Sequence, residues 1–270
     1  MAGGYELYDN HDKITSEELD YNIGYINSLF KPITGSKKTY RLSDENIQGF
    51  GFEKTKHLVK NNLEGYLHSG KLLTSLLQRV QGMGVQVFNH MEVTAIQKKN
   101  DGFTLQTSHN IGFETSKVLV CTNAFTKSLF PEMDIVPARG QVLVTTPIEH
   151  LPFKGSFHSD EGFYYFRNLG NRVLLGGARN KAFHAEETTE METSEYIQFE
   201  LERYLREVIL PNFKEQYQVE YRWAGIMAMG TEKLPLVQEL EPGIFSAVRM
   251  SGMGVALTPV TGQQVAQMMY

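Results

Sequence analysis

The sequence lacks the features that mark several large classes of protein. It has one cysteine, Cys121, among 270 residues, so no disulfide can form within the chain, which fits a reducing compartment. No apolar run reaches the length of a membrane span. Residues 1–4 are not a charged segment leading into an apolar core, so no signal peptide is visible. We therefore expect a cytoplasmic protein that does not use a membrane.

Positive charge and metal-binding patterns are also scarce. The chain has 26 Lys and Arg against 31 Asp and Glu, a net charge of −5 at pH 7, which argues against a general nucleic-acid binder. The eight histidines show no metal-site spacing, so no metal is expected. There is no Gly-x-Ser-x-Gly elbow, and the apolar strand around Cys121 indicates an inert thiol.

The first half of the chain contains clear helix and strand signals. Thr15 and Glu18 have the spacing of a capping box, and apolar residues at helical spacing follow until Pro32, where we expect the helix to end. A second amphipathic helix is predicted from about Lys71. Segments 85–88, 92–99 and 103–107 are strand-like, with a hairpin turn at residues 100–102.

Residues 117–124, KVLVCTNA, form an unbroken apolar run ending in small polar residues. Such a run is typical of a buried parallel strand. Asn123 then has two interpretations, because it could cap the helix that follows or face a ligand at the carboxyl end of the strand.

From about Ile135 the pattern changes to apolar–polar alternation. Segments 140–145, 162–168 and 172–178 alternate with turns, as an antiparallel sheet would. A helix with one apolar face and another strand, residues 219–229, follow them. Alternation places Tyr165 and Arg167 on one face of their strand, and Tyr164 and Phe166 on the other.

The last segment, residues 244–270, is the most informative. A strand, IFSAV, runs into Gly252-Met253-Gly254, after which an apolar helix begins. Glycines allow a ligand to approach the backbone closely, and the first N–H groups of a helix are unpaired and partly positive. Such a corner suits an anionic or electron-rich group, although a lone G-x-G is more often an ordinary turn.

Four segments together resemble the D-amino-acid oxidase superfamily of FAD-dependent enzymes, which includes glycine and sarcosine oxidases. They are residues 117–131, 135–145 with P-A-R-G-Q, 221–237 with W-A-G, and 249–270 with S-G-M-G. The resemblance covers nearly the whole chain in order. It implies an α/β fold with α+β character: a partial Rossmann-like FAD-binding domain, and an antiparallel-sheet substrate domain with helices on one face.

The resemblance also implies the domain boundaries and the cofactor. Residues 1–60 and 128–233 would form the substrate domain, and residues 61–127 and 234–270 the remaining part of the FAD domain. A cleft between two lobes that interleave in sequence would be the binding site. The residues expected to contact FAD are Val93, Thr122, Asn123, Ala124, Gly252, Met253, Gly254, Val255 and Ala256.

The family's strand–GxGxxG–helix unit, which holds the FAD pyrophosphate, is not found. The pairs Gly49/Gly51, Gly82/Gly84 and Gly252/Gly254 each lack the third glycine at the required spacing. The sequence therefore resembles a family member without that unit, and we expect it to bind FAD weakly or not at all.

The resemblance implies a small-molecule substrate, an amine or amino acid oxidised by hydride transfer to the flavin. Tyr165, Arg167, Met227 and Arg249 are the expected substrate-binding residues. Met227 stands where D-amino-acid and glycine oxidases carry a carboxylate-binding arginine, so Arg167 or Arg249 would have to replace that charge. The alternatives are a FAD-linked 2-hydroxy-acid or polyol dehydrogenase, and a non-catalytic fragment. No catalytic side chain and no oligomeric state can be assigned.

Overall fold

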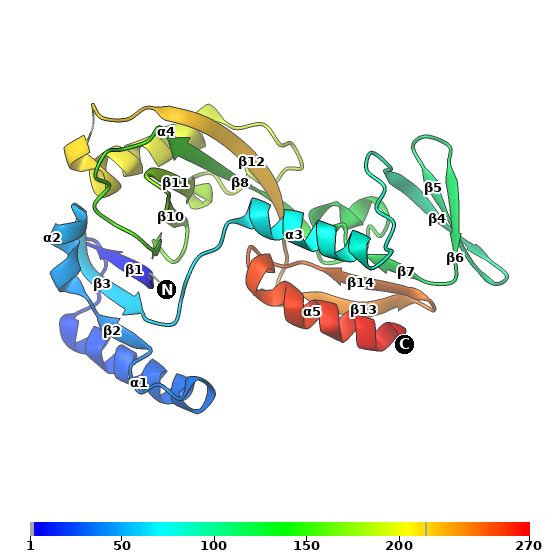
Figure 1. The fold of residues 1–270 in the computed structure, drawn as a ribbon, viewed down its shortest axis with the longest axis horizontal. Helices are drawn as coiled ribbons and strands as arrows, with labels where there is room; N and C mark the ends of the chain where they lie inside the picture. Colours follow the sequence, from blue (N-terminus) through cyan, green and yellow to red (C-terminus); the bar gives the residue numbers. More distant parts are fainter. Residues whose placement is uncertain (1–2, 214) are drawn as a thin grey trace. The chain divides into compact units, whose positions relative to one another are not determined.

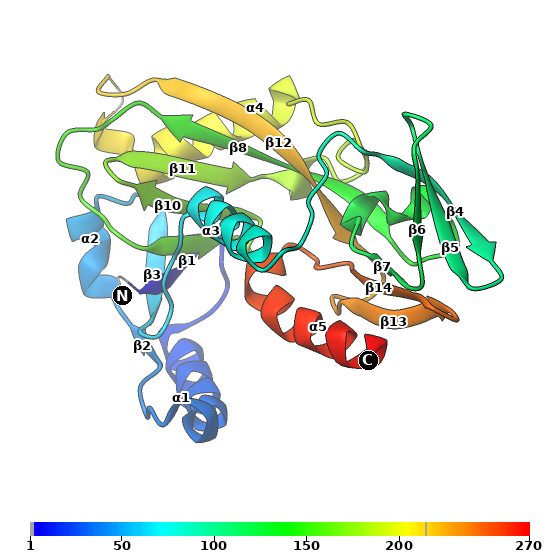
Figure 2. The same cartoon turned by 45° about the vertical axis from the view of Figure 1, so that its right-hand side comes forward.

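A computed structural model describes residues 3–213 and 215–270. The chain divides into two compact units (Figure 1; Figure 2). Unit 1 consists of Met1–Leu72, Gly140–Phe183 and Glu192–Ala224, and unit 2 of Leu73–Arg139, His184–Met191 and Gly225–Tyr270. The units therefore interleave in sequence.

Unit 1 is built on an eight-stranded sheet with the order β12-β8-β11-β10-β9-β1-β3-β2. Strands β1 and β9 run parallel, whereas β1–β3, β9–β10, β10–β11, β8–β11 and β2–β3 are antiparallel pairs. Its strands are β1 (Gly4–Asp9), β2 (Tyr40–Leu42), β3 (Thr55–Asn61), β8 (Val136–Thr145), β9 (Ser156–Ser159), β10 (Tyr164–Leu169), β11 (Arg172–Gly177) and β12 (Val219–Met229).

One face of this sheet carries the core of unit 1. Helix α4 (Glu195–Tyr204), which continues into the π-helical turn η4 (Leu205–Ile209), packs its apolar residues there. The short helix α2 (Ile47–Phe50) also packs against this core. Phe157 is at its centre and contacts five other aromatic rings, including stacked contacts with Tyr5 and Phe166 at 5.0 and 4.7 Å between ring centroids.

Helix α1 (Ser16–Thr34) begins with the predicted capping box. Thr15 Oγ1 accepts a hydrogen bond from the Glu18 N–H at 3.2 Å, and the Glu18 side chain accepts one from the Thr15 N–H. The predicted stop at Pro32 is wrong, because the helix continues to Thr34 and ends at Gly35, which has a φ of 70° and donates to Lys31 O. Pro32 removes one N–H, and the turn closed by Gly35 still completes the helix.

The prediction of helices on one face is also wrong in detail. Helix α1 packs beside β2, where Asn27 exchanges two 2.8 Å hydrogen bonds with the Tyr40 backbone. Leu19, Ile23 and Ile26 of α1 line a cavity with Glu6, which alternates in β1 with the core residues Tyr5 and Leu7. Helix α1 therefore reaches the face opposite the aromatic core.

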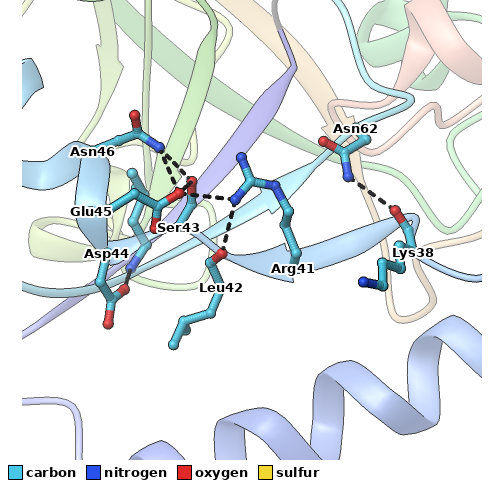
Figure 3. Close-up of polar contacts among 9 residues, drawn as sticks. Lys38, Arg41, Leu42, Ser43, Asp44, Glu45, Asn46 and Asn62 are labelled. Carbon is cyan, nitrogen blue, oxygen red and sulfur yellow. Dashed lines mark hydrogen bonds and ion pairs between the residues drawn. The ribbon is translucent and has the colours of Figure 1, made fainter.

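The segment after α1 is fixed by local polar contacts (Figure 3). Arg41 donates to the Glu45 carboxylate at 2.9 Å, and Asn46 Nδ2 donates to Ser43 Oγ at 2.7 Å in the 3-10 turn η1 (Asp44–Asn46). The Asn62 side chain donates to Lys38 O at 3.0 Å. The first two bonds stabilise the turn after β2, and the third ties the segment after α1 to the end of β3. Unit 1 also contains the 3-10 turns η3 (Arg179–Lys181) and η5 (Pro211–Phe213).

Unit 2 contains two three-stranded sheets, with the orders β13-β14-β7 and β4-β5-β6. The strands are β4 (Val93–Lys99), β5 (Gly102–Thr107), β6 (Gly112–Thr115), β7 (Val118–Val120), β13 (Leu236–Glu241) and β14 (Ile244–Val248). The helical segments are α3 (Ser69–Gly82), which begins in unit 1, η2 (Asn123–Ser128) and α5 (Gly254–Met269). The predicted turn at residues 100–102 is confirmed by the pairing of Lys99 with Gly102.

Two further expectations need correction. Residues 85–88 are not a strand, and Val85 and Phe88 are more than half exposed. Their sequence has the pattern of a strand, but no strand of the described chain pairs with them. The unit boundaries also differ from those predicted. Residues 61–72 belong to unit 1 and residues 128–139, 184–191 and 225–233 to unit 2. Strands β8 and β12 each run on from one unit into the other. None of the described helices is long and apolar enough to cross a membrane.

The aromatic core makes a stability prediction. Phe157 is fully buried, and replacing it with alanine leaves a cavity among rings that cannot collapse into it. We expect Phe157→Ala to lower the free energy of unfolding by about 3–5 kcal/mol, measured by urea denaturation. Phe199→Ala, at a position 57% exposed on α4, is the matched control and should cost well under half as much. Equal losses would contradict the assigned core.

Candidate functional site

Two parallel strands of unit 2 end side by side. Strand β7 pairs with β14, with Val118 opposite Ile244 and Val120 opposite Ser246. Because the strands are parallel and in register, their carboxyl ends meet at one edge of the sheet. Ligands bind at such edges in open α/β sheets. The predicted parallel strand is therefore present, although it is only three residues long and Leu119 remains exposed.

The Asn123 side chain joins these two strand ends. Its Oδ1 accepts hydrogen bonds from the N–H groups of Arg249 at 3.1 Å and Met250 at 3.4 Å. The predicted alternative, in which Asn123 caps the following helix, is wrong, because Thr122 occupies the cap position and no side-chain cap bond forms. Asn123 accepts from the neighbouring strand end instead.

The backbone at this edge is strained. Asn123, Arg249 and Ser251 have φ values of 46°, 60° and 49°, and Gly252 has 81°. Left-handed φ values are costly for residues other than glycine, and they cluster where surrounding structure enforces them for function. The long hydrogen bonds to Asn123 provide part of that enforcement.

Helix α5 begins at this edge with unpaired donors. Within the described chain, the N–H groups of Gly254 and Val255 have no backbone acceptor, whereas Ala256 and Leu257 both donate to Met253 O. Ser251 Oγ is buried and has no hydrogen-bond partner among the described residues. Two free N–H groups, a helix dipole and a buried hydroxyl form a polar cradle for an electron-rich group.

A cavity of about 890 Å³ lies beside the strand ends in unit 2. Asn123 and Met250 line it at the edge of the sheet, and Thr258, Thr261 and Val265 line it from α5. This volume lies within the range of ordinary cofactor and ligand pockets. Cys121 also lines this cavity, and partial burial raises the pKa of its thiol.

The structure brings most of the predicted cofactor residues together. Thr122 and Asn123 follow β7, and Met253, Val255 and Ala256 are exposed around the start of α5. Two of the predicted residues are poorly placed to contact a cofactor. The side chain of Ala124 is 4% exposed and belongs to the core of unit 2. Val93 begins β4, in the other three-stranded sheet.

Unit 1 presents a polar sheet face, and strand register determines its layout. Glu6 of β1 lies opposite His158 of β9, which lies opposite Tyr165 of β10. One pair along, Ser156 lies opposite Arg167. Tyr164 and Phe166 point into the core, so Tyr165 and Arg167 share the polar face, as alternation predicts.

The loop after β3 covers part of this face. Glu64 accepts a hydrogen bond from Ser156 Oγ at 3.0 Å, and its carboxyl group occupies the space that a Cβ on Gly4 would need. The Arg167 guanidinium lies 5.4 Å from the centre of the Tyr66 ring, a cation–π contact. A side chain at Gly4 would therefore displace the Glu64 carboxylate.

Glu6 has the most strongly shifted carboxyl group on this face. Burial raises its pKa to about 7, and the negative charges of Glu64 and Asp12 add to the effect. The His158 ring lies beside it, with Nδ1 3.9 Å from Glu6 Oε2. Sequence reasoning missed Glu6, Glu64 and His158 because they meet only through the pairing of distant strands. It also missed Ser251, although the S-G-M-G motif contains it.

The four predicted substrate residues lie in different environments. Tyr165 and Arg167 are half-buried on the polar face of unit 1, and Met227 Sδ lies 3.5 Å from where a Cβ on Gly252 would be. Arg249 is 3% exposed: its Nε donates to Leu234 O at 2.9 Å and its Nη1 to the Asp134 carboxylate at 2.5 Å. The geometry does not favour Arg249 as a substrate ligand.

The mixed α/β fold, with its large mixed sheet, matches solved oxidoreductases. L-proline dehydrogenase from P. horikoshii superposes with a TM-score of 0.79 at 19% identity, covering 98% of this chain and 71% of that one. Glycine oxidase from Geobacillus kaustophilus gives 0.79 at 19% identity, covering 98% and 69%. At these identities the likeness supports the fold alone.

The profile of the FAD dependent oxidoreductase (DAO) family matches residues 34–268. The chain belongs to this family, which confirms the resemblance drawn from the four motifs. "Probable oxidoreductase OrdL" of Rhizobium meliloti is 22% identical over 234 residues, 83% of this chain and 52% of that protein. N-methyl-L-tryptophan oxidase of Escherichia coli O81 is 33% identical over 76 residues, 28% and 20%. The chain spans about half the length of the OrdL relatives.

The surroundings of Arg249 make a prediction about stability. Replacing Arg249 with methionine removes charged hydrogen bonds that connect β14 to residues 134 and 234. We expect the unfolding midpoint to fall by roughly 5 °C, because each charged hydrogen bond contributes measurably to stability. Arg167→Met, at a half-exposed site, should change the midpoint by only about 1 °C. An unchanged midpoint for Arg249→Met would return Arg249 to the list of ligand-binding residues.

Glu6 makes a prediction about pH. Its folded pKa of about 7 lies above the ordinary 4.5, so its contribution to stability is complete below about pH 4.5 and is lost as the pH rises through 7. We expect Glu6→Gln to become more stable than the wild type, by about 1 kcal/mol near pH 8 relative to pH 5, a figure reduced because the side chain is 37% exposed. Urea denaturation at both pH values measures this difference.

The control for this prediction is Glu149→Gln, at a carboxylate 88% exposed in a loop of unit 1. It should follow the pH dependence of the wild type. The assigned environment of Glu6 would be wrong if Glu6→Gln and Glu149→Gln behaved alike.

Proposed function

We propose that this chain forms most of a FAD-dependent oxidoreductase that oxidises a small amine or amino acid. Membership of the DAO family supports the cofactor, and the polar cradle at the start of α5 supports its place. The single observation that carries the proposal is the meeting of two parallel strand ends, unpaired helix N–H groups and the buried Ser251 hydroxyl at one edge of unit 2.

The residues of this cradle fit a flavin. The N–H groups of Gly254 and Val255 would hold an electron-rich part of the ring system, and the bare Cα of Gly254 would allow close approach. Bound FAD supplies a hydride acceptor. The protein's part is to hold the ring, exclude water and stabilise negative charge on it through the start of α5.

We assign substrate binding to unit 1 and cofactor binding to unit 2. Arg167 would bind a substrate carboxylate through two N–H groups, and Tyr165 would lie beside it. Glu6 and His158, the next residues across the sheet, would face the same substrate, and the raised pKa of Glu6 would let its carboxyl group exchange a proton near neutral pH. The names of the relatives, which include oxidases of glycine and N-methyl-L-tryptophan, favour an amine or amino acid.

A second candidate is a FAD-linked 2-hydroxy-acid or polyol dehydrogenase on the same architecture. Arg167 would serve a hydroxy acid as well as an amino acid. Anaerobic bleaching of the bound flavin, measured with matched pairs of an amino acid and its 2-hydroxy analogue, separates the two. Bleaching by the hydroxy acid alone would replace the amine proposal.

The cradle makes a prediction about FAD binding. The 270-residue chain has no GxGxxG sequence, so we expect it to lose FAD during gel filtration. Joined to a strand–GxGxxG–helix segment of a family member, it should retain FAD and turn yellow. In the joined protein, Gly254→Val should weaken FAD binding at least tenfold, because a side chain would stand between the helix N–H groups and the ligand.

The fold should accept this change, because a Cβ at Gly254 would make only ordinary contacts, the nearest at 3.5 Å to Met250 Cβ. The control is Gly49→Val in unit 1, where a Cβ meets nothing within 4 Å. Equal FAD affinity in both variants would remove the glycine corner from the cofactor site. A fluorescence titration with FAD measures both affinities.

A further inference from the structure

Helix α1 has a second apolar face that nothing in the described chain covers. Its inner residues pack toward β2 and β1, yet four large outer side chains follow one another at a spacing of four residues. These residues are Tyr21 (75% exposed), Tyr25 (59%), Leu29 (53%) and Ile33 (82%). Single exposed apolar residues are common, but a continuous line of them marks a contact surface.

The row beside this ridge is shallow. Gly24, Ser28 and Pro32 are exposed and also lie four residues apart, and a Cβ on Gly24 would meet no atom within 4 Å. A ridge of large residues at i, i+4 next to a groove of small ones allows a second helix to pack closely against this face. One helix therefore offers both the ridge and the groove that a second identical helix needs.

Charge is distributed unevenly along the same helix. Glu17 and Glu18 lie in its first turn, and Lys31 lies in its last turn, with Lys37 and Lys38 just beyond. An antiparallel pair of such helices places the acidic end of each near the basic end of the other, whereas a parallel pair places like charges together.

The ends also match in shape when the pair is antiparallel. A twofold axis on the outer face, midway between Tyr25 and Leu29, brings Ile33 of a second copy next to Tyr21. A shallow hollow lies there, lined by Ile14, Glu17 and Tyr21 among others. The same axis brings the segment that follows α1 in the second copy, which contains Lys37, toward Glu17.

We propose that the outer face of α1 is a self-association surface, on which the α1 helices of two copies of this chain pack antiparallel. The contact is smaller than a standard interface of roughly 1,600 Å², so the dimer is weak, with a dissociation constant on the order of 10 µM. The surface belongs to unit 1 and is separate from the strand-end cradle of unit 2.

The test is sedimentation equilibrium of the 270-residue chain over about 1–200 µM. The wild type should pass from monomer to dimer in this range. Gly24→Leu fills the groove and should weaken the dimer at least tenfold, while raising the unfolding midpoint because leucine favours a helix more than glycine does. Loss of the dimer in a more stable protein cannot be attributed to misfolding.

Two further variants test the ridge and the orientation. Tyr25→Glu should weaken the dimer at least tenfold, whereas Tyr196→Glu, at a tyrosine 52% exposed on α4, should not. Glu17→Lys should weaken the dimer about threefold or more, and the double variant Glu17→Lys with Lys37→Glu should restore it.

Three outcomes would overturn the proposal. The wild-type chain could remain monomeric throughout the range. It could associate equally well with Gly24→Leu, in which case other apolar surfaces, such as that of α3, cause the association. Finally, the double charge exchange could fail to restore a dimer lost in Glu17→Lys, which would exclude the antiparallel arrangement.

Discussion

The candidate site depends on one side-chain amide, that of Asn123. Its Oδ1 accepts from two successive N–H groups after β14, while its own backbone follows β7. The residues after β14 must then turn with left-handed φ values through Arg249, Ser251 and Gly252 before α5 begins. The first N–H groups of α5 lack acceptors, as at any helix start, and the turn held by Asn123 sets where these donors lie.

Arg249, the first residue after β14, also helps to hold the end of this strand in place. Its guanidinium donates hydrogen bonds to the Asp134 carboxylate and to Leu234 O. Hydrogen bonds from Thr231 hold the pKa of Asp134 below its ordinary value, and the charge of Arg249 makes a smaller contribution. A fixed ion pair at this place keeps β14 in register with the preceding segment. The charge that sequence comparison suggests for a substrate is thus used inside the protein, which leaves Arg167 as the better candidate.

Local signals predicted local structure well. The Thr15–Glu18 capping box, the turn at residues 100–102 and the alternation of β10 all rely on residues close in sequence, and all are present. Pro32 was misread because a missing N–H in the last turn costs little when Gly35 closes the helix. Residues 85–88 have the composition of a strand, but a strand also needs a neighbour, which composition does not reveal.

The site was predictable only where a motif is continuous in sequence. The glycine corner at residues 252–254 and the end of β7 belong to such motifs. The Glu6–His158–Tyr165 row depends on the pairing of three strands far apart in the chain, and the internal use of Arg249 depends on Asp134 and Leu234. Neither has a signal in spacing or periodicity, because register between distant strands is set by the packed core.

The central claim is that the start of α5 holds an electron-rich part of FAD. The most direct measurement is amide hydrogen exchange at Gly254 and Val255, in the chain joined to a GxGxxG segment, with and without FAD. The account predicts that FAD slows exchange at these two amides, while the N–H of Gly49 in unit 1 is unaffected. Unchanged exchange at Gly254 and Val255 in protein that has bound FAD would contradict it.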